Sequence, residues 1–198
     1  MIRIARAEDA EAIASIYRPI VASTAISFEL VPPSVEEIKQ RILTNVQFAP
    51  WLVFTGSQDR VLGYAYASKH RERLAYQWSV DVAIYVDPEQ RRRGIGWALY
   101  NSLAALLRLQ GFYAAHAGIT LPNPASVALH ESIGFRPVGV YQAVGYKLGA
   151  WHDVGWWQLS LRERAAEPAP PHSVEEARRD PEWDSALRAG AREGARDR

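Results

Sequence analysis

The chain has 198 residues, 48% of them hydrophobic, which is enough for one domain with a substantial core. Its 23 basic and 22 acidic residues leave a formal net charge of +1, so the broad positive excess of nucleic-acid-binding proteins is missing and we expect no nucleic-acid partner. The chain has no cysteine, which excludes disulfides, thiolate metal sites and a cysteine nucleophile, and we expect no bound metal.

The N-terminal segment MIRIARAEDAEAIASIY carries acidic side chains early and has no long apolar run. We therefore expect neither a signal peptide nor a membrane span, and we predict a cytoplasmic location.

The first third of the chain predicts two helices and three strands. The first helix has one apolar face, and Pro19, which cannot donate an interior hydrogen bond, is predicted to end or kink it near Tyr17. Ser34 and Glu37 have the spacing of a capping box and predict a second helix that runs toward Asn45. The strands are predicted at 2–4, 51–55 and 61–67, the last two as an antiparallel hairpin.

The middle of the chain alternates between strands and helices. In chain order, the patterns predict a strand at 79–86, a helix at 94–111, a strand at 113–121, a short helix at 125–134 and two closing strands at 135–145 and 153–161.

The composition changes at about residue 165, where the sequence becomes rich in proline, alanine and charge. We predict one domain over residues 1–164 followed by a mostly unpacked tail over 165–198. A second capping-box spacing, Ser173 to Glu176, predicts a brief helix in that tail, with Trp183 and Leu187 as possible anchors on the body.

The segment YVDPEQRRRGIGWALY, residues 85–100, joins a predicted strand to a predicted helix. Its glycine spacing matches neither the P-loop pattern GxxxxGK[ST] nor the Rossmann pattern GxGxxG. The arrangement Arg91-x-x-Gly94-x-Gly96 instead exposes unpaired amides where the helix dipole adds positive potential, with arginines nearby. It predicts a binding site for a pyrophosphate; the alternative is a tight turn beside a solvated arginine run.

This segment resembles the acetyl-CoA-binding motif of the GNAT N-acetyltransferases, which reads Gln or Arg, two residues, Gly, one residue, then Gly or Ala. More narrowly, STAISFE, GYAYASKHRERLAY, LPNPASVALHESIGF and GYKLGAWHDVGWWQLSL resemble the phosphinothricin or methionine sulfoximine acetyltransferase subgroup over residues 1 to about 162. The resemblance implies the GNAT fold, an α/β (α+β) architecture with a mixed central sheet flanked by helices. It also implies acetyl-CoA as cosubstrate, a small amino-acid acceptor and a homodimer.

The resemblance also assigns residues to the cosubstrate. It implies that backbone amides hold the pyrophosphate, that a strand pairs through its main chain with the pantetheine arm, and that a helix start contacts that arm. The pyrophosphate residues are Arg91, Arg92, Arg93, Gly94, Ile95, Gly96 and Trp97. The strand residues that pair with the arm are Ile84, Tyr85 and Val86, and the helix-start residues are Asn123 and Ser126. Asparagine and serine also cap helices, and the two roles are compatible.

Two side chains are candidates for moving protons. Asp81 lies in an otherwise apolar strand, where a carboxylate is costly, and it is the first candidate base for the amine. The subgroup usually has glutamate there, so the shorter aspartate either loses reach or regains it through a water chain, and a purely structural Asp81 is the alternative. His130 stands where many GNAT enzymes carry the tyrosine that protonates the leaving thiolate, and acid and base roles both remain open.

The subgroup region that lines the acceptor site corresponds to Phe28, Glu29, Arg71, Arg73 and Tyr76. An arginine can clamp the carboxylate of an amino-acid substrate, although surface arginines are often only solvated. The alternative functions are acetylation of a peptide N-terminus or a polyamine, and acyl-CoA sensing without turnover, which the Asp81 departure keeps open.

Overall fold

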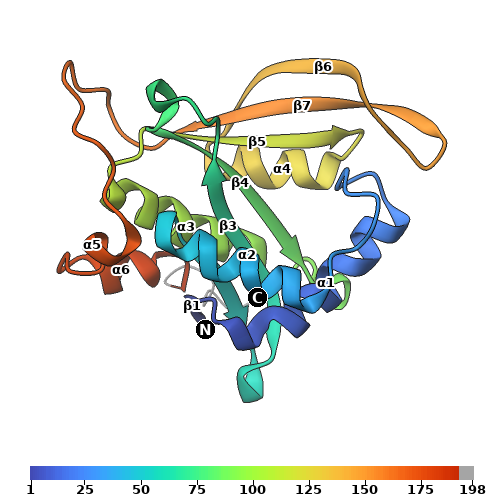
Figure 1. Cartoon of the computed structure of the whole chain (residues 1–198), viewed down its shortest axis with the longest axis horizontal. Helices are drawn as coiled ribbons and strands as arrows, with labels where there is room; N and C mark the ends of the chain where they lie inside the picture. The colour runs from blue at the N-terminus through green and yellow to red at the C-terminus, as the bar shows by residue number, and fades with distance from the viewer. Residues whose placement is uncertain (192–198) are drawn as a thin grey trace.

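The computed structural model of the chain describes residues 1–191. Its core is one seven-stranded sheet with the strand order β1-β2-β3-β4-β5-β7-β6 (Figure 1). All neighbouring strands are antiparallel except β4 and β5, which are parallel. The strands are β1 (Ile2–Ile4), β2 (Trp51–Thr55), β3 (Val61–Lys69), β4 (Ser79–Val86), β5 (Ala114–Leu121), β6 (Arg136–Lys147) and β7 (Ala150–Ser160).

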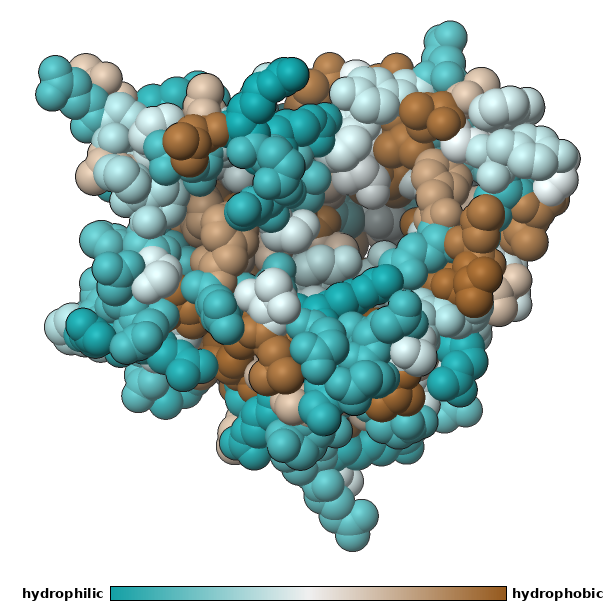
Figure 2. Space-filling model, viewed as in Figure 1, coloured by the Kyte–Doolittle hydropathy of each residue, from teal (hydrophilic) through white to brown (hydrophobic). Residues whose placement is uncertain are grey.

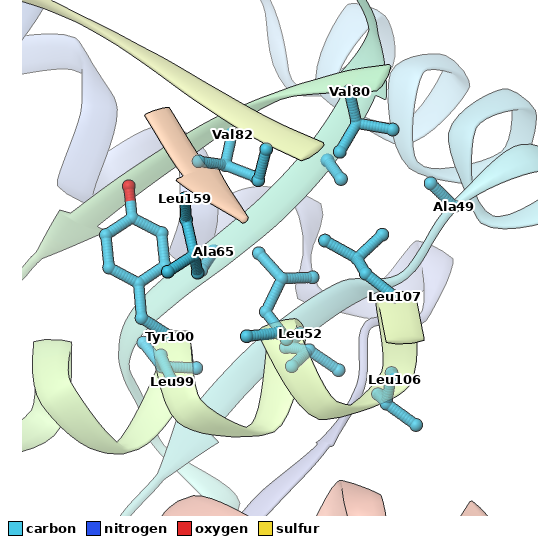
Figure 3. Packing of buried hydrophobic residues seen from close by; sticks show 14 of the residues in the cluster. Ala49, Leu52, Ala65, Val80, Val82, Leu99, Tyr100, Leu106, Leu107 and Leu159 are labelled. Atoms are coloured by element: carbon cyan, nitrogen blue, oxygen red, sulfur yellow. The ribbon is translucent and has the colours of Figure 1, made fainter. Parts of the chain in front are cut away.

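Helices cover both faces of this sheet, and each face has its own hydrophobic cluster. One cluster joins α1 and α2 to β2 and β3, and the other joins α3 and α4 to the central strands. Figure 3 shows the second cluster, in which Leu99 and Tyr100 of α3 extend toward the strands. The helices are α1 (Ala10–Ser23), α2 (Val35–Phe48), α3 (Ile95–Gln110), α4 (Pro124–Ile133), α5 (Val174–Ala177) and α6 (Trp183–Leu187). None of the helices among residues 1–191 is both long and apolar enough to cross a bilayer.

Helix α1 does not end near Tyr17, so that part of the prediction for Pro19 is wrong: the helix continues through Pro19 to Ser23. Ile20 and Val21 lie beyond the proline and are buried, at 5% and 0% exposure. Burial of two such side chains contributes roughly 1.5 to 3 kcal/mol each, which offsets the roughly 3 kcal/mol cost of an interior proline. The capping box that opens α2 is confirmed, with reciprocal hydrogen bonds between Ser34 and Glu37.

Strands β4 and β5 separate along their length. They pair only where Ser79–Asp81 meets Ala114–His116. Beyond that point β4 stays paired with β3 as far as Val86, and β5 stays paired with β7 as far as Leu121. Figure 1 shows the two strands meeting at one end and diverging toward the other. The sheet is therefore open between β4 and β5, and the β4 backbone from residue 82 onward has a free edge.

The C-terminal segment packs onto α3, so the prediction of a mostly unpacked tail is wrong over residues 174–191. Its few apolar side chains gather on one face, and Val174, Ala177 and Trp183 are buried in the same cluster as α3. Ser102 of α3 donates a hydrogen bond to the carbonyl of Leu187 at 2.8 Å, which ties α6 to the helix. The predicted brief helix after Ser173 and the Trp183 anchor are confirmed. The rest of the predicted tail, 192–198, lies outside the described residues.

Candidate active site

The start of α3 offers a run of free backbone amides. Gly94, the N-cap residue, has a left-handed φ of 74°, and no side chain caps the helix. Among the described residues, none of the backbone amides from Arg91 to Trp97 donates a hydrogen bond; the first helical bond runs from the Ala98 amide to the Gly94 carbonyl. The first turn has no acidic residue. Seven successive donors at a positive helix end are suited to an anion such as a pyrophosphate.

Gly96 has a packing role at this helix start. A Cβ at Gly96 would lie 3.0 Å from Cδ2 of Leu129 in α4 and 3.5 Å from Cδ1 of Ile84 in β4. The bare backbone therefore lets α3, α4 and β4 come together. At Gly94 a Cβ would meet nothing within 4 Å, so its φ is the reason for glycine there.

A pocket lies in the opening between β4 and β5. It brings together five of the predicted site residues: Ile84, Tyr85, Asn123, Ser126 and His130. The rest of its lining consists of Ile26, Val82, Ala83, Tyr100, Gly118, Ile119 and Thr120. Figure 2 shows the molecule hollowed below the layer of β5, β6 and β7, with hydrophobic as well as hydrophilic residues around the hollow. Val86 ends the free edge of β4 and does not line the pocket.

His130 is 3% exposed, and both of its ring nitrogens have hydrogen-bond partners. Its Nδ1 lies 2.7 Å from the Ser126 carbonyl, which only accepts, so Nδ1 carries a proton. Its Nε2 lies 2.9 Å from the hydroxyl of Tyr100, which then donates to it. Burial lowers the pKa of His130, against the opposing effect of the Ser126 hydrogen bond, and this favours the neutral ring. Burial raises the pKa of Tyr100, which also lines the pocket, so the pair holds a neutral hydroxyl beside a neutral ring at this wall of the pocket.

Asn123 and Ser126 form the start of α4. The Asn123 side chain caps the helix by accepting a hydrogen bond from the Ser126 amide at 3.2 Å. The capping role is confirmed, and contact with the pantetheine arm stays a prediction.

Asp81 lies at the closed end of the opening, where β4 and β5 last pair. Its carboxylate is 2.6 Å from Nδ1 of His70, the residue that follows β3. The His70 ring stacks on His116 of β5 with ring centroids 4.4 Å apart, and Tyr76 meets it edge-on at 5.9 Å. Burial raises the pKa of Asp81, and the hydrogen bond from His70 opposes this effect. Asp81 and Tyr76 are thus brought into one cluster.

Sequence reasoning missed three members of the site: His70, His116 and Tyr100. His116 alternates with the buried Ala115 and Ala117, which placed it on the opposite face of its strand from the core. If the strands 79–86 and 113–121 had been predicted as parallel neighbours, His116 would have been placed beside Asp81.

The other predicted acceptor residues differ in position. Glu29 is held by Arg41 at 2.7 and 3.1 Å and accepts a hydrogen bond from Tyr17, so its charge is engaged away from the pocket. Phe28 packs against the backbone of Gly145 in β6. Arg71 donates to the carbonyl of His70 at 2.7 Å. Arg73 is exposed, and no described residue forms an ion pair with it.

The sequence profile described as an acetyltransferase (GNAT) domain matches residues 2–156. The chain belongs to the GNAT acetyltransferase family. The GNAT fold and the enzyme class predicted from the sequence are confirmed.

Within the GNAT family, this chain is similar to several named acetyltransferases. Phosphinothricin N-acetyltransferase of Streptomyces viridochromogenes is 37% identical over 87% of this chain and 92% of its own length. The L-methionine sulfoximine/L-methionine sulfone acetyltransferase of Pseudomonas aeruginosa is 32% identical over 84% of this chain and 98% of its own. A phosphinothricin acetyltransferase from Sinorhizobium meliloti, solved in complex with AcCoA, superposes with a TM-score of 0.81 at 37% identity, covering 85% of this chain and 92% of that one.

Proposed function

We propose that this GNAT enzyme transfers the acetyl group of acetyl-CoA to the α-amine of a small amino acid or analogue of the phosphinothricin, methionine sulfoximine or methionine sulfone type. The observation that carries the proposal is the run of free amides from Arg91 to Trp97 beside the free edge of β4. A pyrophosphate fits the first, and an extended amide-bearing arm fits the second.

Different residues are proposed to bind different parts of acetyl-CoA. Arg91, Arg92 and Arg93 are exposed around the amides and add positive charge for the pyrophosphate. The main chain of Ile84, Tyr85 and Val86 offers the unpaired edge for the pantetheine arm, and we expect an amide near Ile84 or Tyr85 to stabilise the oxyanion. Asn123 and Ser126 border the same pocket.

Acetyl transfer to an amine needs two proton movements. An ammonium must lose a proton before it attacks the thioester, and the departing thiolate gains one. We assign the first to the Asp81 end of the opening and the second to the Tyr100–His130 pair, which lines the pocket from α3 and α4.

The acceptor is proposed to bind next to the Asp81 cluster. Arg73 is free to pair with the α-carboxylate, and Tyr76 lies against His70. Arg71, which is close to His70 and Asp81, adds positive charge to this side. Phe28 lies in the loop whose Ile26 lines the pocket, and we retain it as an apolar wall. Glu29, engaged by Arg41, is retained only as an indirect support of that loop.

We also propose that the enzyme is cytoplasmic and works as a homodimer. Apolar side chains are exposed on the β6–β7 hairpin at the edge of the sheet, including Val140, Tyr146 and Trp151. Such a surface is typical of a subunit interface.

The test is a thiol-release assay with acetyl-CoA and a panel of amines: phosphinothricin, methionine sulfoximine, methionine sulfone, spermidine and peptide N-termini. We expect turnover with the three amino-acid analogues, and Arg73→Ala should raise their KM about tenfold while sparing amines without a carboxylate. Arg179→Ala, on the exposed face of the C-terminal segment, is the control and should change nothing. A preference for spermidine or peptides, or equal slowing of every amine by Arg73→Ala, would overturn the acceptor assignment.

A further inference from the structure

Four ring or carboxyl side chains gather at the closed end of the opening between β4 and β5. Asp81 and His116 are paired across the last hydrogen-bonded step, and His70 contacts both. The next residues on the same face, Ala83 and Gly118, line the pocket, about 6.6 Å further along the strands. Tyr76 closes the cluster on the loop side.

Asp81 holds His70 in a defined orientation. An ionised carboxylate only accepts hydrogen bonds, so the 2.6 Å contact fixes the proton of His70 on Nδ1 and leaves the lone pair on Nε2. No described residue hydrogen-bonds to this Nε2, and it is not one of the fully buried atoms that lack a partner. The side chains of His70 and Asp81 are 14% and 31% exposed, so both are partly withdrawn from water.

We propose that His70 is the base that takes the proton from the acceptor amine, and that Asp81 is its positioning residue. The inference rests on the proposed function and names a group for its first proton movement. The short side chain of Asp81 already has an oxygen hydrogen-bonded to the imidazole, so it does not itself reach the acceptor amine. The His70 ring extends one ring further than that carboxylate.

The proton and electron movements balance. Nε2 of His70 takes one proton from the ammonium, and the resulting imidazolium keeps its Nδ1–H on the Asp81 carboxylate. The freed nitrogen lone pair forms the C–N bond to the acetyl carbon, and the C–S bond breaks with its electrons on sulfur. The Tyr100–His130 pair gives a proton to the thiolate and is reprotonated by the second amine proton, and His70 returns its proton to solvent.

The groups that face His70 allow it to gain charge. Asp81 on β4 supplies the compensating negative charge, while Arg71 on its own loop opposes it. Tyr76 and Trp156 present ring edges. Burial, with His70 and Arg71 nearby, lowers the pKa of His116 to about 4, so the stacked ring stays neutral near pH 7 and does not repel an imidazolium.

The test compares His70→Gln with Asp81→Asn in the full chain. His70→Gln should lower kcat by about 100- to 10,000-fold, leave acetyl-CoA affinity within about twofold by calorimetry, and abolish the acidic limb of the kcat/KM pH profile. Asp81→Asn should retain that limb but lower kcat, because the imidazole is still present and loses the partner that orients it. Imidazole added to His70→Ala should restore part of the turnover. His172→Gln, an exposed histidine of the C-terminal segment, is the control and should behave as wild type.

The opposite pattern would overturn the proposal: His70→Gln within about threefold of wild type, or an acidic limb that survives His70→Gln and disappears in Asp81→Asn. The comparison of the variants uses whichever amine the wild type prefers. It therefore tests the role of His70 even if the acceptor is not an amino acid. If no amine is acetylated, the proposed function fails separately, and nitrogen-15 NMR of the histidine rings still tests the geometry. Neutral His70 with its proton on Nδ1 supports the proposal, and a proton on Nε2 overturns it.

Discussion

His116 contributes to stability in a way that depends on pH. Burial lowers the pKa of its imidazole from 6.5 to about 4. Below pH 6.5 the unfolded chain binds a proton at this residue that the folded chain does not bind. Its contribution is therefore complete above about pH 6.5 and is lost as the pH falls to about 4.

We expect His116→Gln to weaken the acid sensitivity of the fold. The difference between urea unfolding free energies at pH 7 and pH 4.5 should shrink by about 1 to 2 kcal/mol, allowing for solvent screening of this half-buried ring. His172→Gln is the matched control. An unchanged difference in His116→Gln would show that other groups cause the acid loss.

Gly96 belongs to the amide run and is also a position at which α3 packs closely against α4. Gly96→Ala places its methyl group 3.0 Å from Leu129, and we expect a loss of about 1 to 3 kcal/mol in unfolding free energy together with weaker acetyl-CoA binding. Gly139→Ala in β6, where a Cβ meets nothing within 4 Å, is the control. Equal unfolding midpoints and equal calorimetric affinities for the two variants would contradict this packing role.

At the scale of elements, Trp183 of α6 is 7% exposed and is buried in the same cluster as α3. Trp183→Ala should lower the unfolding free energy by about 3 kcal/mol, because a large buried side chain is replaced by a cavity. Asp184→Ala, exposed on the same short helix, should cost little. Equal denaturation curves for the two variants would mean that the segment contributes nothing to the core.

The elements also show which physical signals a sequence carries. Strand alternation and the capping boxes at Ser34 and Ser173 are local, and both predicted their elements correctly. The course of α1 through Pro19 depends on burial beyond the proline, which local propensity does not reveal. The docking of residues 174–191 depends on a few apolar side chains that pack in the α3 cluster, and the average composition of the segment does not reveal them.

In the candidate site too, local sequence motifs were predicted and contacts between distant segments were not. The amide run and His130 lie inside contiguous motifs, so the sequence identified them. His70 joins Asp81 only because β3 and β4 are antiparallel and place the end of one beside the start of the other. Such a partnership across strands requires the register, which the sequence does not state.

At the scale of the whole molecule, β6 is an edge strand of twelve residues with exposed apolar side chains. Edges of this kind are normally covered. We expect light scattering to give a dimer mass at micromolar concentration, and Val140→Lys together with Trp151→Lys to give a monomer. Leu43→Lys on α2, also at an exposed apolar position, should leave the mass unchanged. A monomeric wild type would contradict the homodimer.

The opening between β4 and β5 divides the sheet into two blocks, β1–β4 and β5–β7, joined directly by only three residue pairs. The two blocks share the α3 cluster but few strand hydrogen bonds, so we expect their backbone amides to exchange with solvent hydrogen at different rates. A ligand that lies along the free edge of β4 acts as the missing strand and couples the two blocks. The resistance of the enzyme to heat and proteolysis should then rise with acetyl-CoA concentration, so in a cell its lifetime would follow the supply of its own cosubstrate.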